Sequence, residues 1–216
     1  MWHDLSQPFY GEMPHSGALP SPEFKTVKDV EDDGINVQYY SVPTHIGTHI
    51  DAPLHFIEGG KSIDEFPLST FAGEGIVLDV STNEVREITM TDVEAADGEV
   101  RPGDIVFLYT GWYEKYGTDD YDPHPWLAEE VAEYFADVGP KLVGLDTITP
   151  DIPVEQRPDG WLEFPVHRTM LSAEVLIAEH LANLKPFLGQ RIDVVGFPIK
   201  IRGGDGAPAR FAAKEL

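Results

Sequence analysis

The residues with the clearest capacity for chemistry lie in one short run, residues 45–55. The run reads His45-Ile46-Gly47-Thr48-His49-Ile50-Asp51-Ala52-Pro53-Leu54-His55, which places three of the chain's eight histidines and a carboxylate close together. Imidazole and carboxylate groups suit zinc, manganese or iron far better than calcium or magnesium. The spacing therefore predicts a metal site at which three protein ligands leave coordination positions for water and substrate.

The positions of these polar residues also predict how they are arranged. All four have odd numbers, so a continuous extended segment would direct them to one side. Gly47 and Pro53 argue against a regular strand throughout, and a turn at Gly47 could bring His45 beside His49. Apolar residues alternate with the polar ones. We therefore expect partial burial, and a buried charge must be paired or bound to something.

The elements that must position this run are short buried strands with few helices between them. Gly-bounded or polar-bounded runs rich in β-branched residues predict strands at 75–80, 104–109, 141–145 and 192–197, and partial alternation predicts another at 36–42. Capping-box spacing from Thr91 to Glu94 predicts a short helix. An apolar face predicts a second helix that begins near Pro125 and ends at Gly139.

The remaining organisation is simple. The first 25 residues are rich in proline and glycine and are expected to be mostly irregular. No internal repeat is visible, and 216 residues fit one domain. This pattern predicts a single α/β domain over residues 1–216 with a mixed sheet.

Composition narrows the class of protein. The chain has 38 acidic and 15 basic residues, a formal charge of -23, and no cysteine. A surface of this charge repels nucleic acid and anionic membranes, so neither is expected as a partner. The even spread of acid along the chain favours adaptation to high salt over an ordinary acidic protein. With no signal sequence or long apolar run evident, we expect a cytoplasmic protein.

The polar run resembles a known signature. Its pattern, His-x-Gly-Thr-His-x-Asp-x-Pro-x-His, is similar to that of the cyclase family of metal-dependent hydrolases, which includes bacterial kynurenine formamidases and isatin hydrolases. The likeness continues through Gly144 to Asp151, which resembles the family's Gly-x-Asp-x-x-Ser/Thr-x-Asp stretch, and through residues 199–210. The resemblance implies a swivelling β/β/α fold assembled as a homodimer or homotetramer, with one or two Zn²⁺ or Mn²⁺ ions.

The resemblance also implies roles for individual residues. His45, His49 and Asp51 would bind the first metal ion. In two-metal members, Asp51 would bridge to a second ion held by a pair that His167 and Glu179 resemble. His55 would be the general acid/base.

Two further residues are candidates for contact with a ligand or with the substrate. Asp146 follows a predicted strand, where site residues often emerge, and it could hydrogen-bond a ligand histidine; it could equally be a plain turn residue. Kynurenine formamidases carry a Pro-x-Trp-Pro-Gly-Asp stretch near the N-terminus, and here Met13-Pro14-His15-Ser16-Gly17 places His15 where that tryptophan stands.

The predicted function is metal-dependent hydrolysis of a carbon–nitrogen amide bond in a small molecule, with His55 protonating the departing nitrogen. The resemblance to arylformamidases implies N-formylkynurenine hydrolysis in tryptophan catabolism. One alternative is an isatin-type hydrolase of a cyclic amide or lactone. Another is a protein that binds a metal or small carboxylate without turnover, although a purely structural site would need no spare acid/base.

Overall fold

The computed structural model describes all 216 residues. Its strands are β1 (His3–Asp4), β2 (Glu23–Lys28), β3 (Val37–Ser41), β4 (His49–Asp51), β5 (Ala72–Asp79), β6 (Glu87–Ile88), β7 (Ile105–Tyr109), β8 (Trp126–Leu127), β9 (Leu142–Leu145), β10 (Leu176–Glu179), β11 (Arg191–Pro198) and β12 (Gly206–Glu215). Its α-helices are α1 (Val30–Asp33), α2 (Met90–Ala95), α3 (Glu129–Val138) and α4 (Pro165–Ser172).

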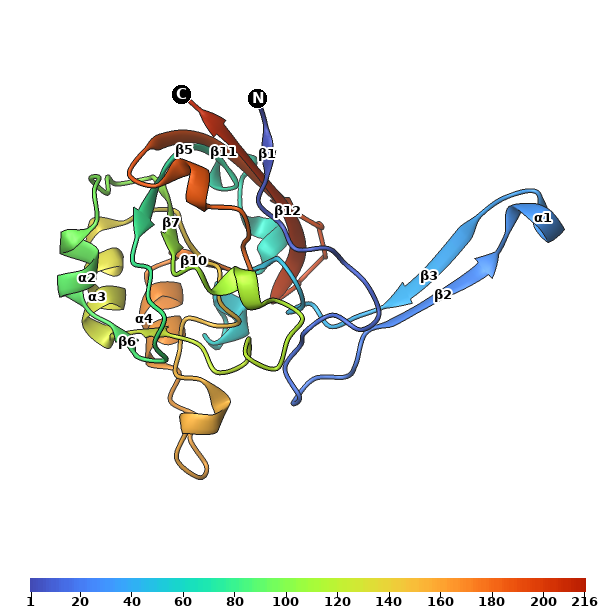
Figure 1. Ribbon diagram of the computed structural model, residues 1–216, viewed down its shortest axis with the longest axis horizontal. Coiled ribbons are helices and arrows are strands. Elements are labelled where there is room, and N and C mark those ends of the chain that lie inside the picture. Colours follow the sequence, from blue (N-terminus) through green and yellow to red (C-terminus); the bar gives the residue numbers. More distant parts are fainter.

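An eight-stranded mixed sheet forms the centre of the molecule and closes on itself (Figure 1). The strand order is β1-β12-β11-β5-β7-β9-β10-β4, and β4 pairs back onto β12. Strands β5, β7, β9 and β10 run parallel to one another, whereas β4, β11 and β12 pair antiparallel with their neighbours. The predicted α/β fold with a mixed sheet is therefore confirmed, and the sheet is barrel-like.

The central strands are buried on both faces, which explains why their sequences are continuously apolar. Val77 and Phe107 point into a core inside the barrel, whereas Ile76 and Leu108 belong to a second core between the barrel and the helices. Side chains alternate between the faces of a strand, so one short run supplies both cores. The strands predicted at 75–80, 104–109, 141–145 and 192–197 are confirmed, and no end differs by more than three residues.

The two predicted helices exist, but both begin at other residues than expected. The capping box of α2 is formed by Thr89 and Asp92, two residues before the predicted Thr91, because the Thr89 side chain and the Asp92 carboxylate cap each other's backbone. Helix α3 begins at Glu129 rather than near Pro125, because Trp126 and Leu127 pair with β6 as strand β8. It ends at Gly139, as predicted, in a left-handed conformation with a φ of 74°.

The first 25 residues are mostly irregular, as predicted, and regular structure there is confined to β1 and the start of β2. Strand β1 adds to the edge of β12, and β2 pairs with β3 in a separate hairpin that carries α1 at its tip. We call this hairpin, residues 23–41, the arm. It projects away from the body of the molecule (Figure 1), and its strands are exposed along nearly their whole length.

None of the helices is both long enough and apolar enough to span a lipid bilayer.

Candidate metal centre

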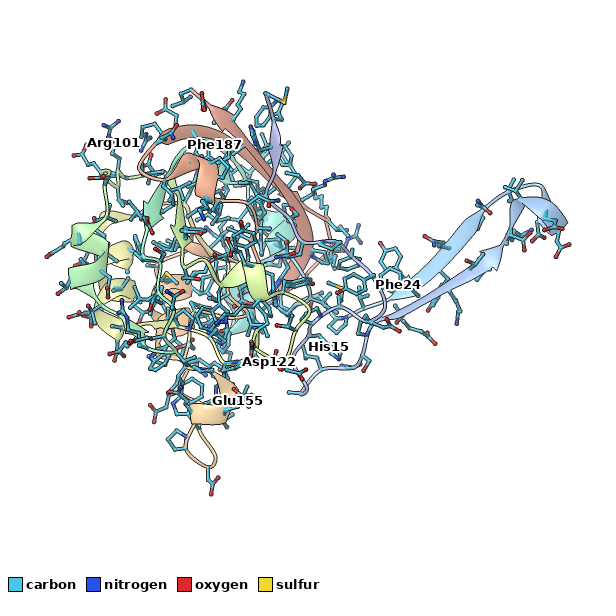
Figure 2. The ribbon with its side chains drawn as sticks, in the orientation of Figure 1. His15, Phe24, Arg101, Asp122, Glu155 and Phe187 are labelled. Atoms are coloured by element: carbon cyan, nitrogen blue, oxygen red, sulfur yellow. The ribbon has the colours of Figure 1, made fainter.

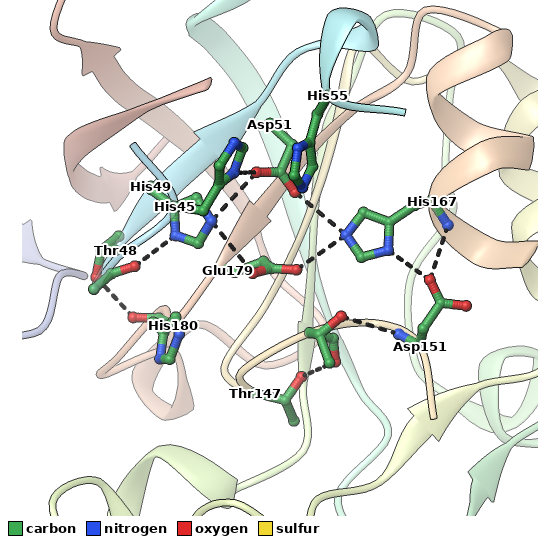
Figure 3. A network of polar contacts seen from close by, with 12 residues as sticks. His45, Thr48, His49, Asp51, His55, Thr147, Asp151, His167, Glu179 and His180 are labelled. Atoms are coloured by element: carbon green, nitrogen blue, oxygen red, sulfur yellow. Dashed lines mark hydrogen bonds and ion pairs between the residues drawn. The ribbon is translucent and has the colours of Figure 1, made fainter. Parts of the chain in front are cut away.

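Two paired strands place three of the candidate ligands on one face of the barrel wall. Ile50 of β4 packs inside the barrel, so His49 and Asp51 on either side of it point outward. Strand β10 pairs with β4 in a register that sets Glu179 opposite His49. The three side chains are buried and converge, as Figure 3 shows.

Helix α4 brings the fourth group to the same point. His167 lies in the first turn of α4, and its Nε2 atom is 3.4 Å from an Asp51 oxygen and 3.3 Å from Glu179 Oε1. On the other side, His49 Nε2 is 3.2 Å from Asp51 Oδ1 and 3.3 Å from Glu179 Oε2. Each carboxylate thus offers one oxygen to His49 and the other to His167.

Hydrogen bonds fix the orientation of both imidazoles. His49 Nδ1 donates to the Gly47 carbonyl at 2.7 Å, which directs Nε2 toward the carboxylates. His167 Nδ1 donates to Asp151 Oδ2, and the Asp151 carboxylate also accepts from the backbone N–H groups of Val166 and His167. Asp151 therefore caps the start of α4 and also fixes the proton of His167 on Nδ1. Hydrogen-bond partners of metal-bound histidines commonly fix the tautomer in this way.

The turn at Gly47 brings His45 beside His49, as predicted. Gly47 has a φ of 56°, a conformation that favours glycine, and the two imidazole rings lie 5.3 Å apart. His45 Nδ1 is 2.6 Å from Asp51 Oδ1. The ring of His55 stacks on that of His45 with 3.7 Å between centroids, and His55 is the more exposed of the two.

Burial and neighbouring charges shift the pKa values of the histidines and carboxylates in the site. Burial and the neighbouring Asp51 raise the pKa of Glu179, whereas His45 and His49 hold the pKa of Asp51 well below its usual value against the effect of burial. Burial disfavours a charged His45, but the Asp51 and Asp205 carboxylates outweigh it and raise the pKa of His45 to about 10. Burial lowers the pKa of His55 to about 4, so that its ring is neutral at pH 7.

The arrangement fits a divalent cation. His49 Nε2 and Glu179 Oε1 are buried atoms without a hydrogen-bond partner, a costly state that a bound ion would relieve. Neighbouring ligand atoms of a tetrahedral ion with bonds of about 2.0–2.1 Å lie about 3.4 Å apart, close to the nitrogen–oxygen distances of 3.2–3.4 Å found here. In two sets of three residues, each residue places one potential ligand atom within 4.8 Å of the others. These sets are His45–Asp51–His55 and His49–Asp51–Glu179, and both contain Asp51.

Asp146 does not contact a ligand histidine. Its carboxylate accepts hydrogen bonds from the backbone and hydroxyl of Thr110 and from the backbone of Gly111, so it joins the ends of β7 and β9. Asp151, five residues later, makes the ligand contact that was one of the expectations for Asp146. His15 lines the cavity beside the site and hydrogen-bonds only the Met13 carbonyl, at 3.1 Å.

Three residues near the site were not expected from the sequence. Asp205 Oδ2 lies 3.0 Å from His45 Nε2, and Asp205 also accepts from the Thr44 hydroxyl. His124 and His180 are buried and line the cavity, and His180 Nδ1 is 2.9 Å from the Tyr121 hydroxyl. Of the three, only Asp205 could have been suspected from its neighbours, because it lies between Gly204 and Gly206 in a pattern typical of a turn.

Comparisons with known proteins agree with this geometry. The cyclase family model, described as "Putative cyclase", matches residues 3–152. The kynurenine formamidase of Salinibacter ruber is 28% identical to this chain, and the match covers 87% of this chain and 84% of the relative. The kynurenine formamidase of Sphingopyxis alaskensis is 29% identical, and the match covers 99% of this chain and 97% of the relative.

Solved structures show the same fold. A potential metal-dependent hydrolase with cyclase activity superposes with a TM-score of 0.81 at 30% identity, covering 100% of this chain and 99% of that one. Isatin hydrolase A from Ralstonia solanacearum superposes with a TM-score of 0.87 at 23% identity, covering 99% and 91%.

Proposed function

The chain belongs to the cyclase family and is a metal-dependent amide hydrolase; on that premise we propose that it cleaves the carbon–nitrogen bond of a small aryl formamide. One observation carries the proposal: the side chains of His49, Asp51, His167 and Glu179 converge next to an open cavity (Figure 3). Among their potential metal-ligand atoms, His49 Nε2 and Glu179 Oε1 are buried and have no hydrogen-bond partner. The names of the relatives support N-formylkynurenine as the first substrate to test.

The residues divide into two tasks. We infer that His45, His49 and Asp51 hold a first Zn²⁺ or Mn²⁺ ion, and that His167 and Glu179 hold a second one bridged by Asp51. An ion bound there supplies Lewis acidity to the amide carbonyl and to water. The position of Asp51 supports this division, because one of its oxygens faces His49 and the other faces His167, so its carboxylate would be common to both ligand sets.

His55 is placed for proton transfer. Its imidazole borders the cavity, stacks on His45 and remains partly exposed, so a substrate nitrogen can reach it. A neutral ring accepts a proton while water attacks the amide carbon, and returns it to the nitrogen as the carbon–nitrogen bond breaks. Phe56 and Phe164 line the same cavity and offer apolar surface for an aryl ring.

Metal analysis combined with a substrate panel tests the proposal. The purified protein should hold one or two divalent ions per chain and should hydrolyse N-formylkynurenine and simpler aryl formamides. Asp51→Ala should lose the metal after dialysis, whereas Asp193→Ala on β11 should keep it. Turnover of isatin or a lactone without turnover of formamides would assign the cyclic amide or lactone alternative. Metal binding without any turnover would assign a binding protein.

We also infer that the protein assembles as a homodimer or homotetramer. The arm supports this inference, because an isolated two-stranded hairpin is at best marginally stable in water. It exposes large side chains, among them Val27, Tyr39 and Tyr40, that a second chain could cover.

A further inference from the structure

Arg157 is a cation without an acidic partner in a strongly acidic chain. No carboxylate lies within 4.0 Å of its guanidinium, and its one hydrogen bond runs from Nε to the Ile152 carbonyl at 2.9 Å. Its two terminal nitrogens make no hydrogen bond to the protein. Arg157 nevertheless lines the cavity that contains the metal ligands. Among the cations that make no ion pair, Arg157 is the one that lines this cavity, and its terminal nitrogens are free to bind a ligand there.

The guanidinium is held in place by its own loop. Arg157 follows the 3₁₀ turn η5 (Val154–Gln156), and its guanidinium carbon lies 4.7 Å from the Trp161 ring and 5.0 Å from the Phe164 ring. The hydrogen bond from Nε and these two rings fix the side chain before any ligand arrives. A cation that is already ordered loses little conformational entropy on binding, which favours affinity.

A row of aromatic rings connects Arg157 to the metal centre. The Phe164 ring lies 4.9 Å from that of Phe56, which lies 4.5 Å from the His167 ring. Phe164 itself is 6.2 Å from His167 and 5.0 Å from the guanidinium. The guanidinium is therefore at most about 11 Å from the His167 ring. The cavity of about 490 Å³ is large enough for a drug-sized ligand.

His124 marks the same cavity as a binding site. It is fully buried, and its Nδ1 donates to the Pro125 carbonyl at 3.0 Å, so Nε2 is left as an acceptor without a partner. A buried polar atom in this state is costly unless a ligand satisfies it. An N–H group of a bound amide or aryl amine would do so.

The cavity also carries charges that oppose an anion. Asp122 and Glu155 line its rim, beside His15 (Figure 2), and Glu179 lies at the metal centre. An anionic ligand is repelled by these groups and attracted by Arg157. Removal of Arg157 and neutralisation of a rim acid should therefore change the affinity for an anion in opposite directions.

We propose that Arg157 anchors the carboxylate of the substrate, so that the enzyme selects acid-bearing aryl amides over neutral ones. This inference rests on the proposed function for its kinetic test. A bidentate guanidinium–carboxylate pair supplies both affinity and orientation. With the acid held at Arg157, the aryl ring lies along Phe164 and Phe56, and the amide reaches the side chains of the metal centre.

Matched substrates test the anchor. For N-formylkynurenine, whose carboxylate lies at the end of a side chain away from the formamide, Arg157→Gln should raise KM and lower kcat/KM by about 10- to 100-fold, the range expected for the loss of a charge-assisted hydrogen bond. For the methyl ester of the same compound, kcat/KM should stay within about twofold. Arg157→Lys, which keeps the charge but loses the planar fork, should fall between. Glu155→Gln should improve kcat/KM for the acid. An equal loss on acid and ester would show that Arg157 only supports its loop, and would overturn the proposal.

Arg168→Gln is the matched control. Its guanidinium lies 5.6 Å from the Phe56 ring and donates to the backbone carbonyls of Glu163 and Phe56, and Arg168 does not line the cavity. This variant should leave the preference for the acid unchanged. A loss of the preference in Arg168→Gln as large as in Arg157→Gln would point to a general charge effect and would contradict an anchor at Arg157.

A binding measurement separates this proposal from the proposed function. Calorimetric titration of metal-loaded protein with kynurenine, the deformylated form of N-formylkynurenine, requires no turnover. At least tenfold weaker binding to Arg157→Gln than to the wild type supports the anchor even if no formamide is hydrolysed, in which case the proposed function alone fails. Equal binding to both proteins overturns the anchor whatever the enzyme hydrolyses.

Discussion

At the scale of single residues, the site depends on carboxylates that serve two neighbours each. Asp51 and Glu179 both lie between His49 and His167, and burial together with the like charge of Asp51 raises the pKa of Glu179. Such a pair is unfavourable without a cation and favourable with one. The same repulsion between the two carboxylates would therefore favour the binding of a divalent cation between them.

His55→Ala should separate metal binding from catalysis. Loss of the imidazole removes the group that carries the proton to the departing nitrogen, so kcat should fall by about 10²- to 10⁴-fold. Metal content, measured by elemental analysis after dialysis, should stay unchanged. His3→Ala, which alters an exposed histidine packed on Phe187, is the control and should retain full activity. A His55→Ala protein with near-normal kcat would rule out this role.

At the scale of elements, the site is assembled from three segments that are distant in sequence. Strand β4 supplies His49 and Asp51, β10 supplies Glu179, and the first turn of α4 supplies His167. Asp151 connects the last of these to the body, because its carboxylate binds both the α4 backbone and the His167 ring.

Asp151→Asn should weaken metal binding more than it weakens the fold. The amide oxygen can still accept from the α4 backbone, but it no longer offers a negative charge to His167 Nδ1. We expect metal affinity, measured by competition with a chelator, to fall by about 10- to 100-fold. Asp92→Asn, at the start of α2, also removes a charge from a helix start but touches no site residue, so it should leave metal affinity unchanged. Equal affinities in both variants would contradict this role.

At the scale of the whole molecule, two features are unusual: a net charge of -23 and an arm that projects from the body (Figure 1). Repulsion among the acidic residues destabilises the compact state, and it weakens as added salt shortens the screening length. The arm places exposed apolar side chains away from the barrel, where they add nothing to its cores.

Added salt should therefore stabilise the protein. The Tm in 2 M KCl should exceed that in 0.1 M KCl by several degrees, because the screening length falls from about 10 Å to below about 3 Å. Sucrose, which does not screen charge, is the control for general effects of cosolutes. A Tm that is independent of KCl would contradict adaptation to high salt.

The mass in solution tests the assembly. Sedimentation equilibrium in KCl should give two or four times the chain mass of 24.0 kDa. Replacement of Tyr39 and Val37 on the arm by serine should shift the equilibrium toward single chains, whereas serine at the exposed Leu162 should not. A single chain at all concentrations would contradict an oligomer.

The sequence by itself determined those features that depend only on residues adjacent to one another along the chain. The strands at 75–80 and 104–109 could be predicted because each buries both faces, and the turn at Gly47 because glycine readily adopts a positive φ. The prediction of a metal site with a nearby acid/base in residues 45–55 could be made for the same reason, since the spacing of these four polar groups is local.

Only the tertiary structure decided what joins that run. Sheet closure sets β10 beside β4, and sequence spacing cannot encode a strand order that depends on contacts across the whole chain. His167 and Glu179 were named through family resemblance, not through their own surroundings. The partner of His167 is Asp151 rather than Asp146, because the start of α4 folds back onto that residue. His124 and Arg157 acquire their importance in the same way, from a cavity that exists only once distant segments have packed together.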